Sequence, residues 1–193
     1  MRPVAIDVAI LLPPATRDRI AELNAACAAP AAGGFRFDAT RHPHITLGQH
    51  FVDADALEAV RAALAPTFET ELPLDLRITG TRNGRATWAA VIAPTAALQH
   101  LHEGVLDALA PYEVTGHPDA FQVNDEPARD ADVQWVTRFR RDSAFDRFAP
   151  HITIGVSSAP APPASWRFTA SDIALCRLGR FCTCRDHLSH WTL

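Results

Sequence analysis

Two short segments of the chain repeat a histidine followed two positions later by a threonine. Residues 43–48 read Pro-His-Ile-Thr-Leu-Gly and residues 150–155 read Pro-His-Ile-Thr-Ile-Gly, so the copies agree at five of six positions. Side chains alternate between the two faces of a β-strand, so each histidine shares a face with its threonine. The apolar residues anchor the opposite face in a core. Each copy therefore presents an imidazole and a hydroxyl together.

These residue types suit proton transfer around a phosphate. If an approximate two-fold axis relates the two halves of the chain, His44, Thr46, His151 and Thr153 converge on one cleft. One neutral histidine can take a proton from water or a hydroxyl, one protonated histidine can supply the leaving oxygen, and the hydroxyls can bind non-bridging oxygens. Both protonation states are accessible because histidine titrates near about pH 6.5. The alternative is a pair of buried strands with satisfied core histidines.

Basic and aromatic residues gather before the second copy. We expect a strand at 133–140, which places Arg138 and Arg140 on one face, where they can bind a phosphate or stack on a base. A solvated charged strand explains the two arginines equally well. Phe148 is a candidate stacking platform, with core packing as its alternative.

Other histidines raise the question of a metal. His50 shares the strand parity of His44, so it lies either at the rim of the cleft or at an exposed strand end. The sequence contains no HExxH motif, and no acidic ligand lies close to the first repeat. We therefore expect neither a metal nor any other cofactor.

Composition limits the function further. The 193 residues are 48% hydrophobic and 21% charged, which predicts one globular domain spanning 1–193 without a membrane-spanning helix. All 18 basic residues are arginine, so chemistry that depends on a Schiff-base or P-loop lysine is excluded. A net charge of -4 opposes bulk binding of nucleic acid or of anionic membranes.

The four cysteines show neither CxxC pairs nor the density of a disulfide framework. We interpret this as a reducing, cytoplasmic setting. Cys182 and Cys184 are then expected to be two thiols on one face of a strand, and not a metal or redox site.

Periodicity and turn residues predict an α+β protein with mostly antiparallel sheets. The segment 111–132 lacks periodicity and is expected to be a long loop that acts as a lid. Expected helices begin at Thr16 and end at Pro30, run from Asp53 to Pro66, and span 95–109. Expected strands lie at 4–10, near Phe35, and at 72–79, 85–92 and 151–157, with a terminal hairpin of 166–178 and 181–193.

Paired His-x-Thr motifs about a hundred residues apart resemble those of the 2H phosphoesterase superfamily, which includes the bacterial RNA 2',3'-cyclic phosphodiesterases also called 2'-5' RNA ligases. The opening strand before a proline-containing turn and the segment Arg147–Ile154 also resemble that family. The resemblance implies a two-lobed, pseudo-two-fold fold around a central cleft. It also implies that His44 and His151 are catalytic and that Thr46 and Thr153 bind phosphate.

The chain departs from the family around both motifs. Many RNA-processing members carry a basic residue and a Phe-Leu-Gly run after the first motif and an arginine soon after the second. Here the corresponding residues are Gly48-Gln49-His50-Phe51 and Gly155-Val156. The resemblance therefore supports the reaction chemistry of the family more strongly than it supports the family's substrate.

The combined expectation is a monomeric, metal-independent hydrolase of a 2',3'-cyclic phosphate or a 2'-5' phosphodiester. Its substrate is expected to be a small nucleotide or an RNA end, because long RNA relies on many cationic contacts. The alternatives are a phosphate-binding module without turnover and RNA 2'-5' ligase-type end processing.

Overall fold

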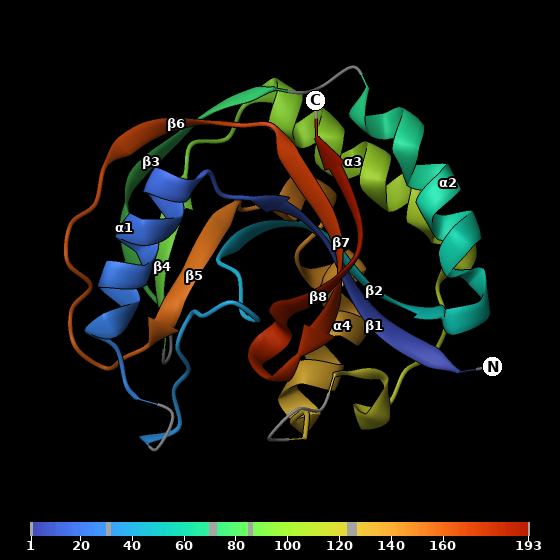
Figure 1. The fold of residues 1–193 in the computed structure, drawn as a ribbon, viewed down its shortest axis with the longest axis horizontal. Helices are drawn as coiled ribbons and strands as arrows, with labels where there is room; N and C mark the ends of the chain where they lie inside the picture. Colours follow the sequence, from blue (N-terminus) through green and yellow to red (C-terminus); the bar gives the residue numbers. More distant parts are fainter. Residues whose placement is uncertain (1, 30–31, 70–72, 85–86, 123–126, 193) are drawn as a thin grey trace.

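Two four-stranded antiparallel sheets form the centre of the molecule (Figure 1). The computed structural model describes residues 2–29, 32–69, 73–84, 87–122 and 127–192. The first sheet has the order β2-β1-β7-β8 and the second β5-β4-β3-β6. The first contains β1 (Pro3–Leu11), β2 (His44–Asp53), β7 (Asp172–Gly179) and β8 (Thr183–Thr192). The second contains β3 (Leu74–Asn83), β4 (Thr87–Ile92), β5 (His151–Val156) and β6 (Trp166–Ala170). This confirms the α+β class.

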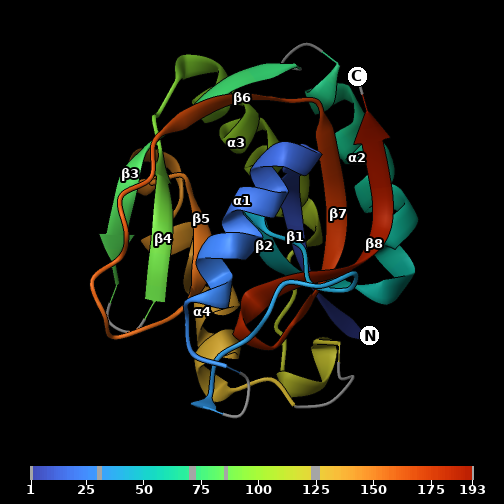
Figure 2. The ribbon, with the colours of Figure 1, turned by 60° about the vertical axis from the view of Figure 1, so that its left-hand side comes forward.

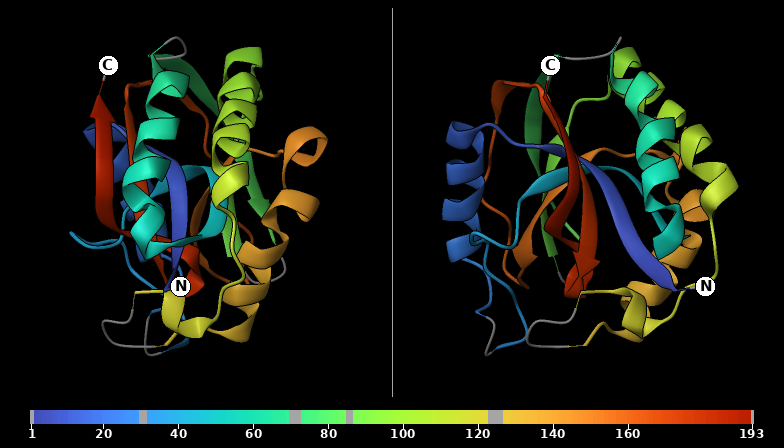
Figure 3. Two further views of the ribbon diagram at one scale, coloured as in Figure 1. Left: turned by 90° about the vertical axis from the view of Figure 1, so that its right-hand side faces the viewer. Right: turned by 45° about the vertical axis from the view of Figure 1, so that its right-hand side comes forward.

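Helices flank the sheets on opposite sides. α1 lies on the far side of the molecule from the pair α2 and α3, and α2 and α3 run side by side (Figures 1 and 3). The α-helices are α1 (Pro14–Ala25), α2 (Leu57–Phe68), α3 (Ala96–Leu109) and α4 (Asp130–Asp142). Short 3-10 turns are η2 (Ala54–Ala56), η3 (Ala110–Tyr112), η4 (Pro118–Ala120), η5 (Phe145–Arg147) and η6 (Arg180–Cys182).

The two repeats form equivalent edge strands, β2 in the first sheet and β5 in the second, and these edges are in contact. The helices cross between the halves, since α3 packs on β2 whereas α1 packs on β5 (Figure 2). One continuous hydrophobic cluster spans both sheets, with Ile45 and Ile152 from the two repeats fully buried in it. The two lobes therefore share a core that anchors both motifs.

Each repeat contains a β-bulge at the same place. Against β1, the register moves from Val8↔Gly48 to Ala9↔Thr46, which leaves one extra residue on β2. Against β4, it moves from Trp88↔Gly155 to Ala89↔Thr153, with the extra residue on β5. Bulges bend a strand and redirect its side chains. The repeated sequence thus encodes a repeated backbone distortion directly after each threonine.

The glycine of each repeat is the point where a helix approaches the strand closely. A Cβ atom at Gly48 would lie 3.1 Å from Cγ1 of Val105 on α3, and one at Gly155 would lie 2.8 Å from Cβ of Cys27, just after α1. Asn24 on α1 also donates a hydrogen bond of 2.7 Å to the carbonyl of Ile154. These contacts fix the motif strands against their helices.

The expected strand at 133–140 is wrong, because these residues belong to α4. Asp132, Val136 and Phe139 are buried at the spacing of one helical face. The Asp132 carboxylate also accepts a 3.0 Å hydrogen bond from the N–H of Arg129, which closes the first turn. Tertiary packing and this cap outweigh the strand preference of the valine and aromatic residues.

Several elements begin or end at other residues than expected. No strand forms near Phe35 within the described residues, Thr16 lies inside α1, and Pro66 lies inside α2 and does not end it. The expected terminal hairpin divides at Ser171, because β6 pairs with β3 in the second sheet while β7 pairs with β8. Parts of the expectations that fall on Pro30, Leu72, Arg85, Asn124, Asp125 and Leu193 lie outside the described residues.

The expectation that Cys182 and Cys184 are two thiols on one face of a strand is also wrong. Cys176 on β7 and Cys184 on β8 form a disulfide, while Cys27 and Cys182 are free. Cys182 lies in η6, before β8 begins, so it does not share a strand face with Cys184. The pairing depends on the irregular register between β7 and β8, which brings the two cysteines together but which spacing alone does not reveal.

The described part of 111–132 packs largely against the first sheet. The N–H of Val114 donates to the carbonyl of Phe51 on β2, and the N–H of Gln122 donates to the carbonyl of Leu178 on β7. Within the described residues no helix is long and apolar enough to cross a membrane.

Candidate active site

A cleft of about 770 Å³ lies where β2 and β5 meet. Its size is in the range of small-molecule sites, which is about 300–1,000 Å³. His44, Thr46, His151 and Thr153 all line this cleft, as the sequence predicts. Phe148 lines it as well. The structure therefore brings together residues that are far apart in the chain.

Both motif histidines are held in the same way. Nδ1 of His44 lies 2.8 Å from the carbonyl oxygen of His42, and Nδ1 of His151 lies 2.8 Å from that of Ala149. In each case the partner is the residue two positions earlier. A carbonyl can only accept, so Nδ1 carries a proton in both rings and Nε2 is the nitrogen that gains or loses one.

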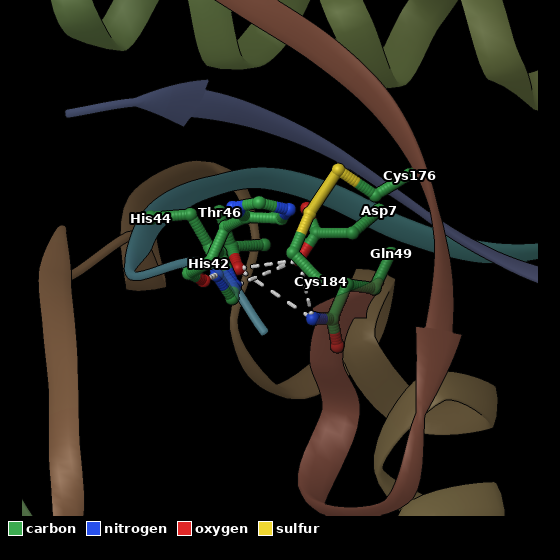
Figure 4. The surroundings of a disulfide bond; sticks show 7 residues. All are labelled: Asp7, His42, His44, Thr46, Gln49, Cys176 and Cys184. Carbon is green, nitrogen blue, oxygen red and sulfur yellow. Dashed lines mark hydrogen bonds and ion pairs between the residues drawn. A yellow bond between two sulfur atoms is a disulfide. The ribbon is translucent and has the colours of Figure 1, made fainter. Parts of the chain in front are cut away.

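Asp7, a fully buried residue of β1, lies beside His44 and Thr46 (Figure 4). Its Oδ2 atom is 3.3 Å from Nε2 of His44 and accepts hydrogen bonds from Thr46 Oγ1 at 2.8 Å and from Gln49 Nε2 at 2.7 Å. Its Oδ1 atom is buried without a hydrogen-bond partner among the described residues. One buried carboxylate thus holds both functional side chains of the first motif.

The surroundings shift the two histidines in opposite directions. Burial lowers the pKa of His44, but the hydrogen bond and the charge of Asp7 outweigh burial, so the pKa is raised overall. Burial lowers the pKa of His151, and the charges of Arg82 and His44 lower it further. Opposite shifts in a pair of titratable groups favour one acid and one base at the same pH.

The bulge in β2 determines which residues follow the motif into the cleft. Because one residue is added after Thr46, Gln49 pairs with Asp7 and lines the cleft. His50 is instead buried away from it, with Nδ1 2.6 Å from the Glu113 carboxylate. The expectation that His50 shares a strand face with His44 is therefore wrong. The bulge adds one residue between them and reverses the alternation of side chains.

Arg138 and Arg140 do not share a face, because two residues correspond to about 200° around a helix. Neither lines the cleft. Arg138 is exposed, while Arg140 is bound by Glu113 at 2.7 Å and by the carbonyl of Leu106 at 2.7 Å. The arginines that line the cleft are Arg82, Arg129 and Arg147.

Arg82 approaches the second motif across the sheet. Arg82 pairs with Ala89 on β4, and Ala89 pairs with Thr153 on β5, so the three side chains lie in one row on one face. The Arg82 side chain is exposed and makes no hydrogen bond or ion pair within the described part of the chain. Residue type and spacing do not reveal Arg82 as a site residue, because only the strand register connects it to Thr153.

Phe148, the aromatic residue expected at the site, is held by packing against one face of its ring. Phe148 stacks on the buried His102 of α3, with ring centroids 3.8 Å apart and an interplanar angle of 3°. His102 Nδ1 donates to the carbonyl of Leu47 at 2.6 Å, and its Nε2 accepts the N–H of Phe145 at 3.0 Å. His102 thus joins the strand of the first motif to the approach of the second.

The rim of the cleft near α4 has a constrained backbone. Phe181 and Cys182 have positive φ angles of 63° and 51°, which residues other than glycine rarely adopt. The N–H of Phe181 donates to Asp132 at 3.2 Å, and the guanidinium of Arg129 lies 4.0 Å over the Phe181 ring. Trp135 adds an aromatic side chain that is 46% exposed. No group of three or more metal-ligating side chains occurs among the described residues.

Comparison with known proteins gives one family match and several structural matches. Residues 12–180 match the family model described as the 2'-5' RNA ligase superfamily. No curated protein sequence matches the chain closely enough to count as a relative.

Solved structures share the fold at low sequence identity. TT0787 of Thermus thermophilus superposes with a TM-score of 0.65 at 19% identity, covering 98% of both chains. E. coli LigT complexed with NADP+ gives a TM-score of 0.60 at 18% identity, covering 99% of this chain and 98% of LigT. A structure titled only as a phosphoesterase gives 0.54 at 20% identity, covering 99% of this chain and 98% of the other.

Proposed function

Because the chain belongs to the 2'-5' RNA ligase superfamily of 2H phosphoesterases, we propose that it is a metal-independent phosphoesterase. It hydrolyses a 2',3'-cyclic phosphate or a 2'-5' phosphodiester of a nucleotide or an RNA end. The observation that carries this proposal is the pair of His-x-Thr motifs on the adjoining strands β2 and β5, whose four side chains line one cleft.

The reaction needs only proton transfer and charge stabilisation. One histidine, neutral at Nε2, removes a proton from a water molecule as the water oxygen attacks phosphorus. The other histidine, protonated at Nε2, gives its proton to the ribose oxygen as the bond from that oxygen to phosphorus breaks. The products are a phosphomonoester and a free hydroxyl. Thr153 and Arg82 can donate to the non-bridging oxygens, whose negative charge grows during attack.

Several observations support a nucleotide-sized substrate. LigT has been crystallised with ATP, 3'-AMP and phosphate, which makes a nucleotide phosphate a reasonable ligand for this related cleft. The cleft volume of about 770 Å³ suits one or two nucleotides. Trp135 and Phe148 offer ring surface for a base, and Arg82 and Arg147 offer positive charge for phosphates.

A single-turnover assay tests the proposal. Excess enzyme, treated with a chelator, is incubated with 2',3'-cyclic mononucleotides, RNA with a cyclic end and 2'-5' dinucleotides, and products are resolved by chromatography. We expect at least one substrate to be hydrolysed, and we expect the His44→Ala/His151→Ala double variant to be inactive. Binding of all probes without any turnover would favour a phosphate-binding module, and joining of RNA ends without hydrolysis would favour a ligase.

A further inference from the structure

The two motif strands have similar backbones, but the charged residue next to each histidine has the opposite sign. Behind His44 the neighbouring strand β1 supplies Asp7, and beside His151 the strand β3 supplies Arg82. The hydroxyls differ too, since the Thr46 hydroxyl donates to Asp7 whereas the Thr153 hydroxyl makes no hydrogen bond to a described residue. The repeat therefore places equivalent histidines in unequal surroundings.

From this geometry, and resting on the proposed function, we propose that Asp7 is a positioning residue that makes His44 the proton donor and leaves His151 as the base. Asp7 does not line the cleft and does not touch substrate; it acts through His44 and Thr46. This assigns different roles to the two histidines, which the sequence repeat alone treats as equivalent.

Burial is the physical reason why Asp7 selects a protonated His44. A buried carboxylate is strongly destabilising unless a positive charge or hydrogen bonds compensate it. Thr46 and Gln49 supply neutral donors to Oδ2, and Oδ1 has no hydrogen-bond partner among the described residues. His44 is the only described residue that forms an ion pair with Asp7. Protonation of His44 is therefore coupled to the charge of Asp7.

The remaining groups around the two histidines agree with this assignment. His42, which precedes β2, offers its carbonyl to His44, and its own pKa is lowered by burial and by the neighbouring His187 and His44. His151 on β5 is influenced by the charges of Arg82 and His44. No carboxylate forms an ion pair with His151 among the described residues. Only the first half of the cleft therefore holds an anion against its histidine.

The separation of 3.3 Å between His44 Nε2 and Asp7 Oδ2 leaves the proton transferable. Charge-assisted N–H···O bonds are typically about 2.7–2.9 Å, so this contact is longer than a tight pair. Thr46 uses its only proton on Asp7, so it can donate to a phosphate only after turning away. The phosphate oxygens are accordingly expected on the side of Thr153 and Arg82, and the leaving oxygen on the side of His44.

NMR titration of the histidine rings tests the proposal independently of activity. In the wild-type protein we expect His44 to titrate at higher pH than His151. In Asp7→Asn, which keeps the shape and removes the charge, we expect the His44 titration to move to lower pH by about one unit or more while His151 changes little. Asp75→Asn on β3 is the matched control, because Asp75 is exposed, binds Thr169 and lies outside the cleft.

Kinetics on the best substrate give the second readout. We expect Asp7→Asn to lower kcat more than it changes KM and to move the descending limb of the pH profile to lower pH, with the ascending limb unchanged. A wild-type His44 that titrates below His151 would overturn the proposal, and so would an Asp7→Asn protein whose His44 titration is unchanged. If Asp7→Asn does not fold, the wild-type order of titration decides. If no substrate is hydrolysed, the proposed function fails while the titration still tests the role of Asp7.

Discussion

At the scale of single residues, each motif histidine has Nδ1 fixed by a main-chain carbonyl and exchanges its proton at Nε2. Both Nδ1 atoms are bound to main-chain carbonyls, so the rings have defined orientations before substrate arrives. Loss of an acid or a base typically lowers a rate by about 100- to 10,000-fold. We expect His44→Ala and His151→Ala each to show a loss of this size in kcat/KM, with circular dichroism and thermal unfolding close to wild type. A folded single variant with full activity would exclude the two-histidine mechanism.

Arg82 provides a second test at this scale. Charge-assisted hydrogen bonds contribute about 1.5–3 kcal/mol, and Arg82 is solvent-exposed, so we expect Arg82→Gln to lower kcat/KM by about tenfold. Arg77→Gln is the control, because Arg77 is an exposed arginine of the same strand that does not line the cleft. Equal effects of the two substitutions on steady-state kinetics would mean that Arg82 acts only through general charge.

The motif residues could be predicted from sequence because residue type and strand parity suffice to place them. Asp7 and Arg82 could not, since each reaches the site from a neighbouring strand whose register only the folded chain defines. An aspartate in an otherwise apolar strand is a weak signal for such a residue. Arg138 and Arg140 were misplaced because their segment is a helix.

At the scale of elements, the close approach of α1 to β5 should limit the size of the residue at 155. The Cβ of an alanine there would lie 2.8 Å from both Cβ and Sγ of Cys27. Overpacking of this kind costs about 1–3 kcal/mol. We expect Gly155→Ala to lower the free energy of unfolding by that amount in urea denaturation.

Gly80→Ala on β3 is the matched control, because its Cβ would meet nothing within 4 Å. We expect this variant to unfold within about 0.5 kcal/mol of wild type. If Gly155→Ala were as stable as Gly80→Ala, the packing of α1 against the motif strand would be looser than described.

The spacing of apolar residues predicts some elements correctly and gives the wrong type of element for others. Thr95 caps α3, which has the expected apolar stripe, and β1 forms where a strand was expected, with both of its faces buried. The segment of α4 contains valine, tryptophan and phenylalanine, whose strand preference conceals a helical spacing of buried positions. The bulges were not predictable either, because nothing in the alternation of residues 44–50 marks an inserted residue.

At the scale of the whole molecule, net charge constrains substrate length. The chain has a net charge of -4, and long RNA needs many cationic contacts that make affinity strongly salt-dependent. We expect kcat/KM for a dinucleotide that ends in a 2',3'-cyclic phosphate to exceed kcat/KM for a 2',3'-cyclic mononucleotide. We expect longer RNA to raise kcat/KM little further. Between about 50 and 200 mM salt the value should fall less than tenfold, since few phosphates are bound. A kcat/KM that rises steeply with RNA length and collapses with salt would contradict this prediction and would make the end of a long RNA the substrate.

The global architecture was predictable in outline from the repeated hexapeptide. Two copies of one motif imply two similar halves, and the structure places them on adjoining edge strands. The crossing of α1 and α3 onto the opposite halves was not predictable, because it depends on long-range packing around a shared core. The disulfide between β7 and β8 escaped prediction for the same reason.

The pH dependence of kcat/KM for the best 2',3'-cyclic substrate, measured with chelator present, tests the central claim most directly. The ascending limb should follow loss of the proton from His151, whose pKa is lowered by burial and then by Arg82 and His44. The descending limb should follow loss of the proton from His44, whose pKa burial lowers but Asp7 raises overall. We therefore predict a bell-shaped profile that brackets about pH 6.5. A rate that rises continuously to high pH, or that disappears with the chelator, would contradict the two-histidine mechanism.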